Sequence, residues 1–135
     1  MRRLARGAWR VSRWLLLSGL WFAGMVYALL LHEGGNTPPP FAHFDKIVHA
    51  GLFFGQFWLL AKVFLQRRRP VPVRALLAVA LVLAAGSEWA QGALTATRQA
   101  DWLDAAADMA GAAAALYFAV QVQAARGRAR DKQEA

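Results

Sequence analysis

The chain has 135 residues, no cysteine and a formal net charge of +8, and 58% of its residues are hydrophobic. This length suits one domain, and the lack of cysteine excludes disulfides, thiolate metal sites and cysteine nucleophiles. The apolar fraction exceeds the roughly 45–50% of soluble proteins and is concentrated in blocks, which indicates a membrane protein. The basic residues lie at the ends of those blocks, so we expect them to contact lipid headgroups and not nucleic acid.

The first apolar block predicts a membrane helix over residues 14–31. Residues 1–13 contain five arginines and form a basic N-terminal segment. The block that follows is long enough to cross a hydrocarbon core of about 30 Å. A signal peptide is the alternative, but the run is long for one and no small-residue cleavage site follows it. We therefore expect an anchoring helix without strongly polar side chains.

Three more helices are expected after a loop that contains Gly34, Gly35 and three prolines. The second helix covers residues 46–66 and has Asp45 at a position suited to an N-cap. Residues 73–94 and 102–125 form the third and fourth helices. The prediction is an all-α, four-helix membrane domain over residues 14–125, followed by a basic tail over 126–135 that frays.

The positions of the basic residues predict an orientation. Five of them lie in residues 1–13, five in 61–74 and four in 126–135, whereas the two other connections hold only Lys46 and Arg98. By the positive-inside rule, both termini and the 61–74 connection are cytoplasmic. Six of the eight acidic residues then lie on or near the outer side.

Polar side chains recur at the predicted outer ends of three helices. They are Asp45, Lys46 and His49 in the second helix, Glu88 and Gln91 in the third, and Arg98, Asp101, Asp104 and Asp108 at the start of the fourth. At 100° per residue, the three aspartates of the fourth helix share a sector of roughly 80° with Gly111 and Ala115. Ionisable groups within membrane segments face the bundle interior or water. We therefore expect these groups to converge.

Three interpretations of this convergence stay open. The first is architectural: Arg98 and Lys46 pair with carboxylates and tie the helix ends together. The second is a site for an extracytoplasmic substrate, with His49, Glu88 and Asp104 as catalytic acids and bases. The substrate-binding candidates are Asp45, Lys46, Gln91, Arg98, Asp101 and Asp108. The third is a site for Mg²⁺, Mn²⁺ or Ca²⁺, but no dedicated metal-binding spacing is present, so the prediction includes no metal ligand and no cofactor.

The three polar elements also have a recognisable order. They are D-K-x-x-H-x-x-x-F from Asp45 to Phe53, S-E-x-x-Q from Ser87 to Gln91, and R-x-x-D-x-x-D-x-x-x-D-x-x-G from Arg98 to Gly111. Together they resemble the VanZ-like family of small bacterial integral membrane proteins, over about residues 44–115. The chain has Asp108 where such proteins typically have Asn, which adds an ionisable group.

The resemblance implies a multi-pass protein of the bacterial plasma membrane with a role in the cell envelope. The family's namesake is associated with resistance to the glycopeptide antibiotic teicoplanin. The expected function is binding or modifying a lipid-linked or surface envelope component, and whether a bond is broken stays open. The alternatives are a small transporter or channel subunit and a purely structural assembly partner. Expected partners are membrane lipids and a lipid-linked precursor. The small residues Gly51 and Gly55, and Ala107, Gly111 and Ala115, are expected to pack helices within the chain, with a homodimer as the alternative.

Overall fold

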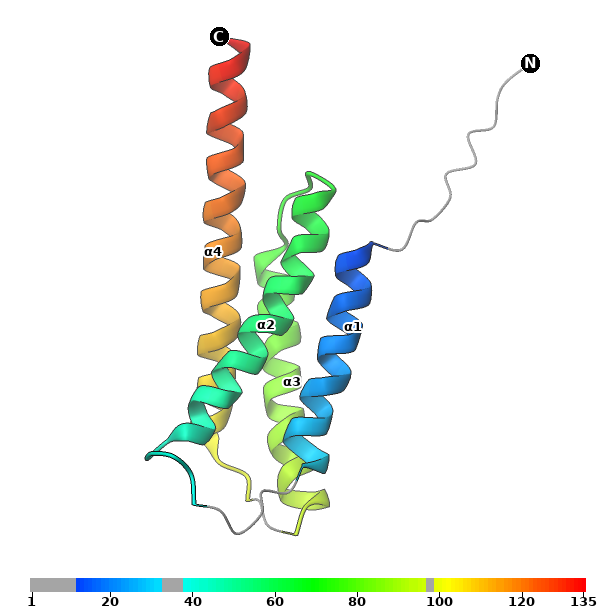
Figure 1. Ribbon diagram of the computed structural model, residues 1–135, viewed down its shortest axis with the longest axis vertical. Helices are drawn as coiled ribbons and strands as arrows, with labels where there is room; N and C mark the ends of the chain where they lie inside the picture. Colours follow the sequence, from blue (N-terminus) through cyan, green and yellow to red (C-terminus); the bar gives the residue numbers. More distant parts are fainter. Residues whose placement is uncertain (1–11, 33–37, 97–98) are drawn as a thin grey trace, which may run out of the picture.

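The computed structural model describes residues 12–32, 38–96 and 99–135, which are helical with no strand among them. The elements are α1 (Arg13–Val26), the π-helical turn η1 (Tyr27–Leu31), α2 (Phe44–Gln66), α3 (Val73–Leu94) and α4 (Trp102–Glu134) (Figure 1). The predicted all-α architecture is confirmed for these residues.

Four helices are long and apolar enough to cross a membrane: α1 continued by η1, α2, α3 and α4. Large apolar side chains lie on their outer surfaces, among them Leu20 and Val82, each 71% exposed, and Trp102, 76% exposed. A soluble protein rarely presents so much contiguous apolar surface to water. The outer surface therefore suits contact with lipid acyl chains.

Two expected helix boundaries are corrected. Helix α2 begins at Phe44 with His43 as its N-cap, at φ 62°, so Asp45 lies in the first turn and is not the cap. Its carboxylate there still faces the positive end of the helix dipole. Helix α4 continues to Glu134 and does not fray after Ala125. An ion pair of 2.7 Å between Arg130 Nε and Glu134 Oε1, at i and i+4, supports this last turn.

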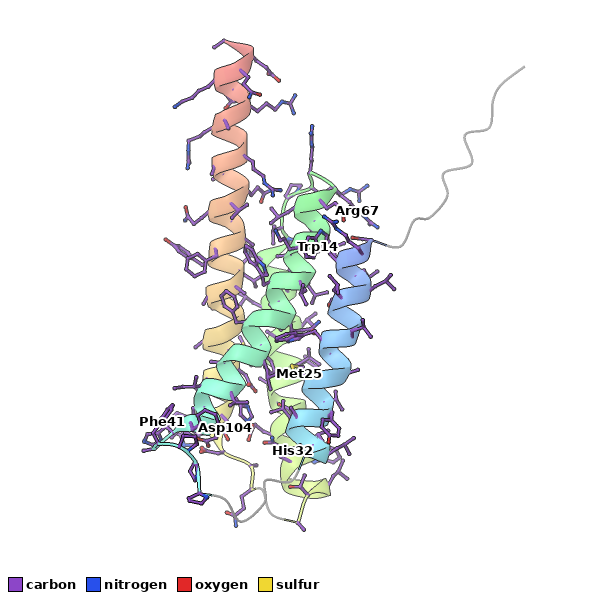
Figure 2. The ribbon with its side chains drawn as sticks, in the orientation of Figure 1. Trp14, Met25, His32, Phe41, Arg67 and Asp104 are labelled. Carbon is purple, nitrogen blue, oxygen red and sulfur yellow. The ribbon has the colours of Figure 1, made fainter. Side chains whose placement is uncertain are left out.

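Helix α2 packs against α1 on one side and α4 on the other, and α3 packs against α4 and η1. The α1–α2 and α3–α4 connections lie at the same end of the bundle, and the α2–α3 connection lies at the opposite end (Figure 1). Figure 2 shows Asp104 near the first of these ends, together with Phe41 and His32, and Arg67 and Trp14 towards the other. The two ends therefore differ in the sign of the charges they carry.

Small residues let α2, α3 and α4 approach closely. Ala80 and Ala84 of α3 and Ala112 and Ala115 of α4 are fully buried. Gly111 is tighter still, because a Cβ there would stand 2.8 Å from the carbonyl carbon of Ala50 and would clash with its oxygen. This close crossing places the first turns of α2 beside the first turns of α4, and so brings their polar side chains together.

A candidate functional site at one end of the bundle

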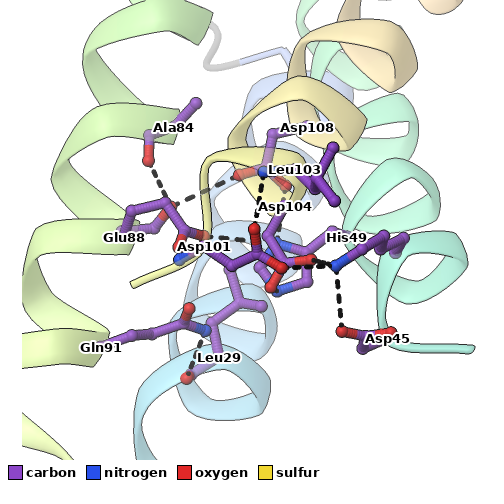
Figure 3. A network of polar contacts seen from close by, with 12 residues as sticks. Leu29, Asp45, His49, Ala84, Glu88, Gln91, Asp101, Leu103, Asp104 and Asp108 are labelled. Carbon is purple, nitrogen blue, oxygen red and sulfur yellow. Dashed lines mark hydrogen bonds and ion pairs between the residues drawn. The ribbon is translucent and has the colours of Figure 1, made fainter. Parts of the chain in front are cut away.

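Six ionisable residues from three helices meet at the end where α2 and α4 begin and α3 closes (Figure 3). This polar cluster consists of Lys46, His49, Glu88, Asp101, Asp104 and Asp108. His49, Glu88, Asp104 and Asp108 are buried, with Asp108 fully enclosed. Charged groups in such a position are costly unless they are paired, so the partner of each group in the cluster must be identified.

Lys46 joins the starts of α2 and α4. Its Nζ lies 2.6 Å from Asp104 Oδ1, 2.8 Å from Asp101 Oδ2 and 3.4 Å from Asp45 Oδ2. The hydrogen bond from Lys46 holds the pKa of Asp101, just outside α4, below its usual value, and a backbone N–H bond from Leu103 adds to this effect. That second bond also makes Asp101 the N-cap of α4. Lys46 therefore fixes the acidic entry of α4 against α2.

His49 is the centre of the buried part of the cluster. Its Nδ1 lies 2.9 Å from Asp108 Oδ1 and 4.0 Å from Glu88 Oε1, and its Nε2 lies 3.8 Å from Asp104 Oδ2. The side chain of His49 is only 2% exposed. In the tautomer that carries the proton on Nδ1, this nitrogen donates to Asp108 and the Nε2 lone pair is turned to Asp104. One imidazole thus faces three carboxylates from two other helices.

Glu88 has one satisfied oxygen and one unsatisfied oxygen. Oε2 accepts a hydrogen bond of 2.7 Å from the backbone N–H of Asp101. Oε1 is buried and has no hydrogen-bond partner among the described residues, although His49 Nδ1 is 4.0 Å away. Among the described residues, Gln56 Oε1 is the other buried side-chain oxygen without a hydrogen-bond partner. Such an atom is costly, because its desolvation is not repaid. Glu88 is therefore the least explained member of the cluster if its role is only architectural.

Two polar residues of α3 serve neighbouring contacts. Ser87 donates a hydrogen bond of 2.9 Å to the carbonyl of Ala84, and its hydroxyl lies 3.5 Å from Asp108 Oδ2. Gln91, 1% exposed, donates from Nε2 to the carbonyl oxygen of Leu29 over 3.0 Å. Gln91 thus ties α3 to the π-helical turn that ends the first span. Its amide therefore does not join Glu88 in one site, as the sequence predicted.

Most of the predicted site residues do lie together. The cluster contains His49, Glu88 and Asp104, predicted as acids and bases, and Lys46, Asp101 and Asp108, predicted as binding residues. Asp45 is at its edge, with a side chain 59% exposed, and the Gln91 amide bonds η1. Arg98 lies outside the described residues.

The contact that the sequence did not predict is the backbone of η1. The first helix was expected to lack strongly polar side chains, and the group that it contributes is a backbone carbonyl, that of Leu29, which accepts a hydrogen bond from the Gln91 amide. This carbonyl is available because the last carbonyls of a helix have no partner within the helix. The helix here ends by widening into a π-turn, a form that is frequent at functional sites. The apolar run Tyr27–Leu31 gives no residue pattern for that widening.

The cluster combines groups that can move protons with groups that can hold a cation. Nδ1 of His49 and Oε1 of Glu88 lie 4.0 Å apart. An imidazole and a carboxylate are both side chains that act as general acids or bases. One ring nitrogen of His49 and one oxygen from each of Glu88 and Asp104 also lie within 4.8 Å of one another. Comparisons of the chain with models of protein families, with curated proteins and with solved structures gave no match.

Proposed function

We propose that this chain is a multi-pass protein of the bacterial plasma membrane, with both termini in the cytoplasm and the polar cluster at the outer face. The distribution of charge supports this orientation. Arg67, Arg68 and Arg69 follow α2, and further arginines line the last turns of α4, all away from the cluster. At the cluster end, Lys46 is engaged by carboxylates. A cytoplasmic side rich in arginines satisfies the positive-inside rule.

We propose further that the cluster binds or modifies a lipid-linked or surface component of the cell envelope, in the manner implied by the resemblance to VanZ-like proteins. The observation that carries this proposal is the buried, unpartnered Oε1 of Glu88 beside His49. A network that only held helices together would be expected to satisfy its buried acceptors. In the proposed site, protons are exchanged between the ligand and three side chains, those of His49, Glu88 and Asp104. These three side chains are held in place by Lys46, Asp101 and Asp108.

A translocation pathway is less well supported. Beyond the cluster, the described interior of the bundle is filled by apolar side chains, including Phe53, Phe57 and Leu116, all at most 1% exposed. Gln56 donates 2.7 Å to Ser18 on the opposite side of α2, towards α1. The polar groups of the interior therefore do not line up behind the cluster, as a transporter route would require.

The test is teicoplanin susceptibility in a sensitive bacterial host at matched membrane abundance. The strains express the wild type, Glu88→Gln, His49→Ala or the control Glu134→Gln, which makes the same Glu-to-Gln change at an exposed position of α4. The proposal predicts protection by the wild type and by Glu134→Gln, and loss of protection by the two cluster variants. Protection by all four proteins would show that the cluster is architectural, and protection by none would remove the glycopeptide phenotype from the proposal.

A further inference from the structure

We infer that His49, Glu88 and Asp104 form a binding site for a divalent transition-metal cation, with Mn²⁺ and Zn²⁺ as the best matches. The inference adds an ion to the site of the proposed function, but it rests on the contacts in the cluster and not on the reaction. Its test measures the ion directly, so it can fail while the proposed function holds, and the reverse.

The first support is the number of charges. Among the described residues of the cluster, Glu88, Asp101, Asp104 and Asp108 face only Lys46 and His49. Lys46 is already held by Asp101 and Asp104 at 2.8 and 2.6 Å. Buried like charges at this density are unfavourable without a compensating cation. A divalent ion would place positive charge beside the three buried carboxylates, Glu88, Asp104 and Asp108.

The second support is independent of the charge count and concerns Glu88 Oε1. The Glu88 side chain is 9% exposed, and this oxygen has no hydrogen-bond partner among the residues that the structure describes. It is turned towards His49, with 4.0 Å to Nδ1. A bound cation would give this oxygen the partner that it lacks, at a metal–oxygen distance of about 2.0–2.2 Å.

The third support is the arrangement around the imidazole. Nδ1 of His49 lies 2.9 Å from Asp108 Oδ1, and Nε2 lies 3.8 Å from Asp104 Oδ2. In the tautomer that carries the proton on Nδ1, the Nε2 lone pair faces Asp104 Oδ2. Two acceptors that face each other repel unless a proton or cation lies between them. A carboxylate that orients a histidine whose other nitrogen binds metal is a recurrent feature of metal sites. The fully buried Asp108 occupies the orienting position.

The ligand atoms determine which ion fits. One imidazole nitrogen and two carboxylate oxygens lie within 4.8 Å of one another, and they must approach by about 1 Å to reach ordinary ligand spacing, which side-chain rotation can supply. Imidazole favours transition metals over Ca²⁺ and Mg²⁺, and carboxylates favour Mn²⁺ and Zn²⁺ over Cu⁺. The mixed set therefore selects Mn²⁺ or Zn²⁺.

The experiment is a Mn²⁺ titration of the full chain in detergent micelles, purified without a polyhistidine tag and stripped with EDTA. Free Mn²⁺ is followed by electron paramagnetic resonance, and Zn²⁺ is then added as a competitor. The expected result is one Mn²⁺ per chain, displaced by Zn²⁺, with at least a ~10-fold loss of affinity in Glu88→Gln and less than a ~2-fold change in Glu134→Gln.

Two results would overturn the inference: a wild type that binds neither ion, or equal affinities in the wild type and Glu88→Gln. A measurement on the wild type alone covers the case in which Glu88→Gln does not fold. Electron spin-echo modulation of the bound Mn²⁺ must show coupling to a nitrogen nucleus, as an imidazole ligand requires. Bound Mn²⁺ with oxygen ligands only would place the ion elsewhere.

Discussion

Substituting Gly111 with alanine should separate the helices that form the site. A Cβ at this position would stand 2.8 Å from the carbonyl carbon of Ala50 and 2.9 Å from its Cα, and would clash with its oxygen. Carbon atoms in ordinary contact are about 3.5–4.0 Å apart. Because both helices are rigid and the obstacle is backbone, α2 and α4 must move apart by about 1 Å.

The cost follows from that displacement. Overpacking of a tight contact costs about 1–3 kcal/mol. The same movement stretches the 2.6 Å contact from Lys46 to Asp104 and the 2.9 Å contact from His49 to Asp108, and each weakened polar contact adds about 1 kcal/mol. We therefore expect Gly111→Ala to lower the free energy of unfolding by about 3–5 kcal/mol.

Gly51→Ala is the matched control for this prediction. It lies in α2, within one residue of the clash site, and a Cβ there would have no heavy atom within 4 Å. Alanine is the better helix former, so this variant should be neutral or slightly stabilised. Thermal unfolding of both proteins in the same detergent, followed by circular dichroism at the helix bands, gives the comparison. Equal melting of Gly111→Ala and the wild type, or equal losses in the two variants, would refute the close crossing of α2 and α4.

Two further predictions concern single polar contacts. Gln91→Leu removes the donor to the buried Leu29 carbonyl and should lower the free energy of unfolding by about 1–2 kcal/mol. The Mn²⁺ affinity of the cluster should stay within about 2-fold of the wild type. A variant as stable as the wild type would show that this bond does not hold α3 to the first span. For Asp101, the hydrogen bond from Lys46 lowers the pKa below the ordinary 3.8, so its contribution is present above pH 3.8 and is lost as the pH falls below it. The melting difference between wild type and Asp101→Asn should therefore persist at pH 5 and shrink only below pH 3.8, and a difference that disappears near pH 5 would contradict the paired carboxylate.

The sequence predicted the cluster because charge in an apolar chain is rare and helical spacing assigns each charge to a face. Asp104 and Asp108 are four residues apart, and Gly111 follows three residues later. All three are buried on one face of α4, as that spacing requires. The spacing could not name the partner of each face. That pairing depends on the close crossing at Gly111 and Ala50, which is a property of two helices together.

Backbone features explain the remaining differences. Gln91 follows Glu88 by three residues, which predicted a shared site, but its amide bonds the Leu29 carbonyl in a π-helical turn that no residue type marks. The N-cap of α2 moved from Asp45 to His43 because His43 adopts a left-handed conformation that starts the helix earlier. Local backbone geometry of this kind is decided by tertiary packing as much as by propensity.

The most direct test of a working site is to measure stability and protection on the same Glu88→Gln protein. Gln keeps the size of Glu and keeps an oxygen that accepts the hydrogen bond of 2.7 Å from the Asp101 N–H. The amide nitrogen of Gln then replaces Oε1, the oxygen that has no hydrogen-bond partner and lies beside His49. We expect the melting of Glu88→Gln to match that of Glu134→Gln, with protection against teicoplanin lost in Glu88→Gln alone. Retained protection, or a loss of protection that parallels a loss of stability, would contradict the assignment of the cluster as a functional site.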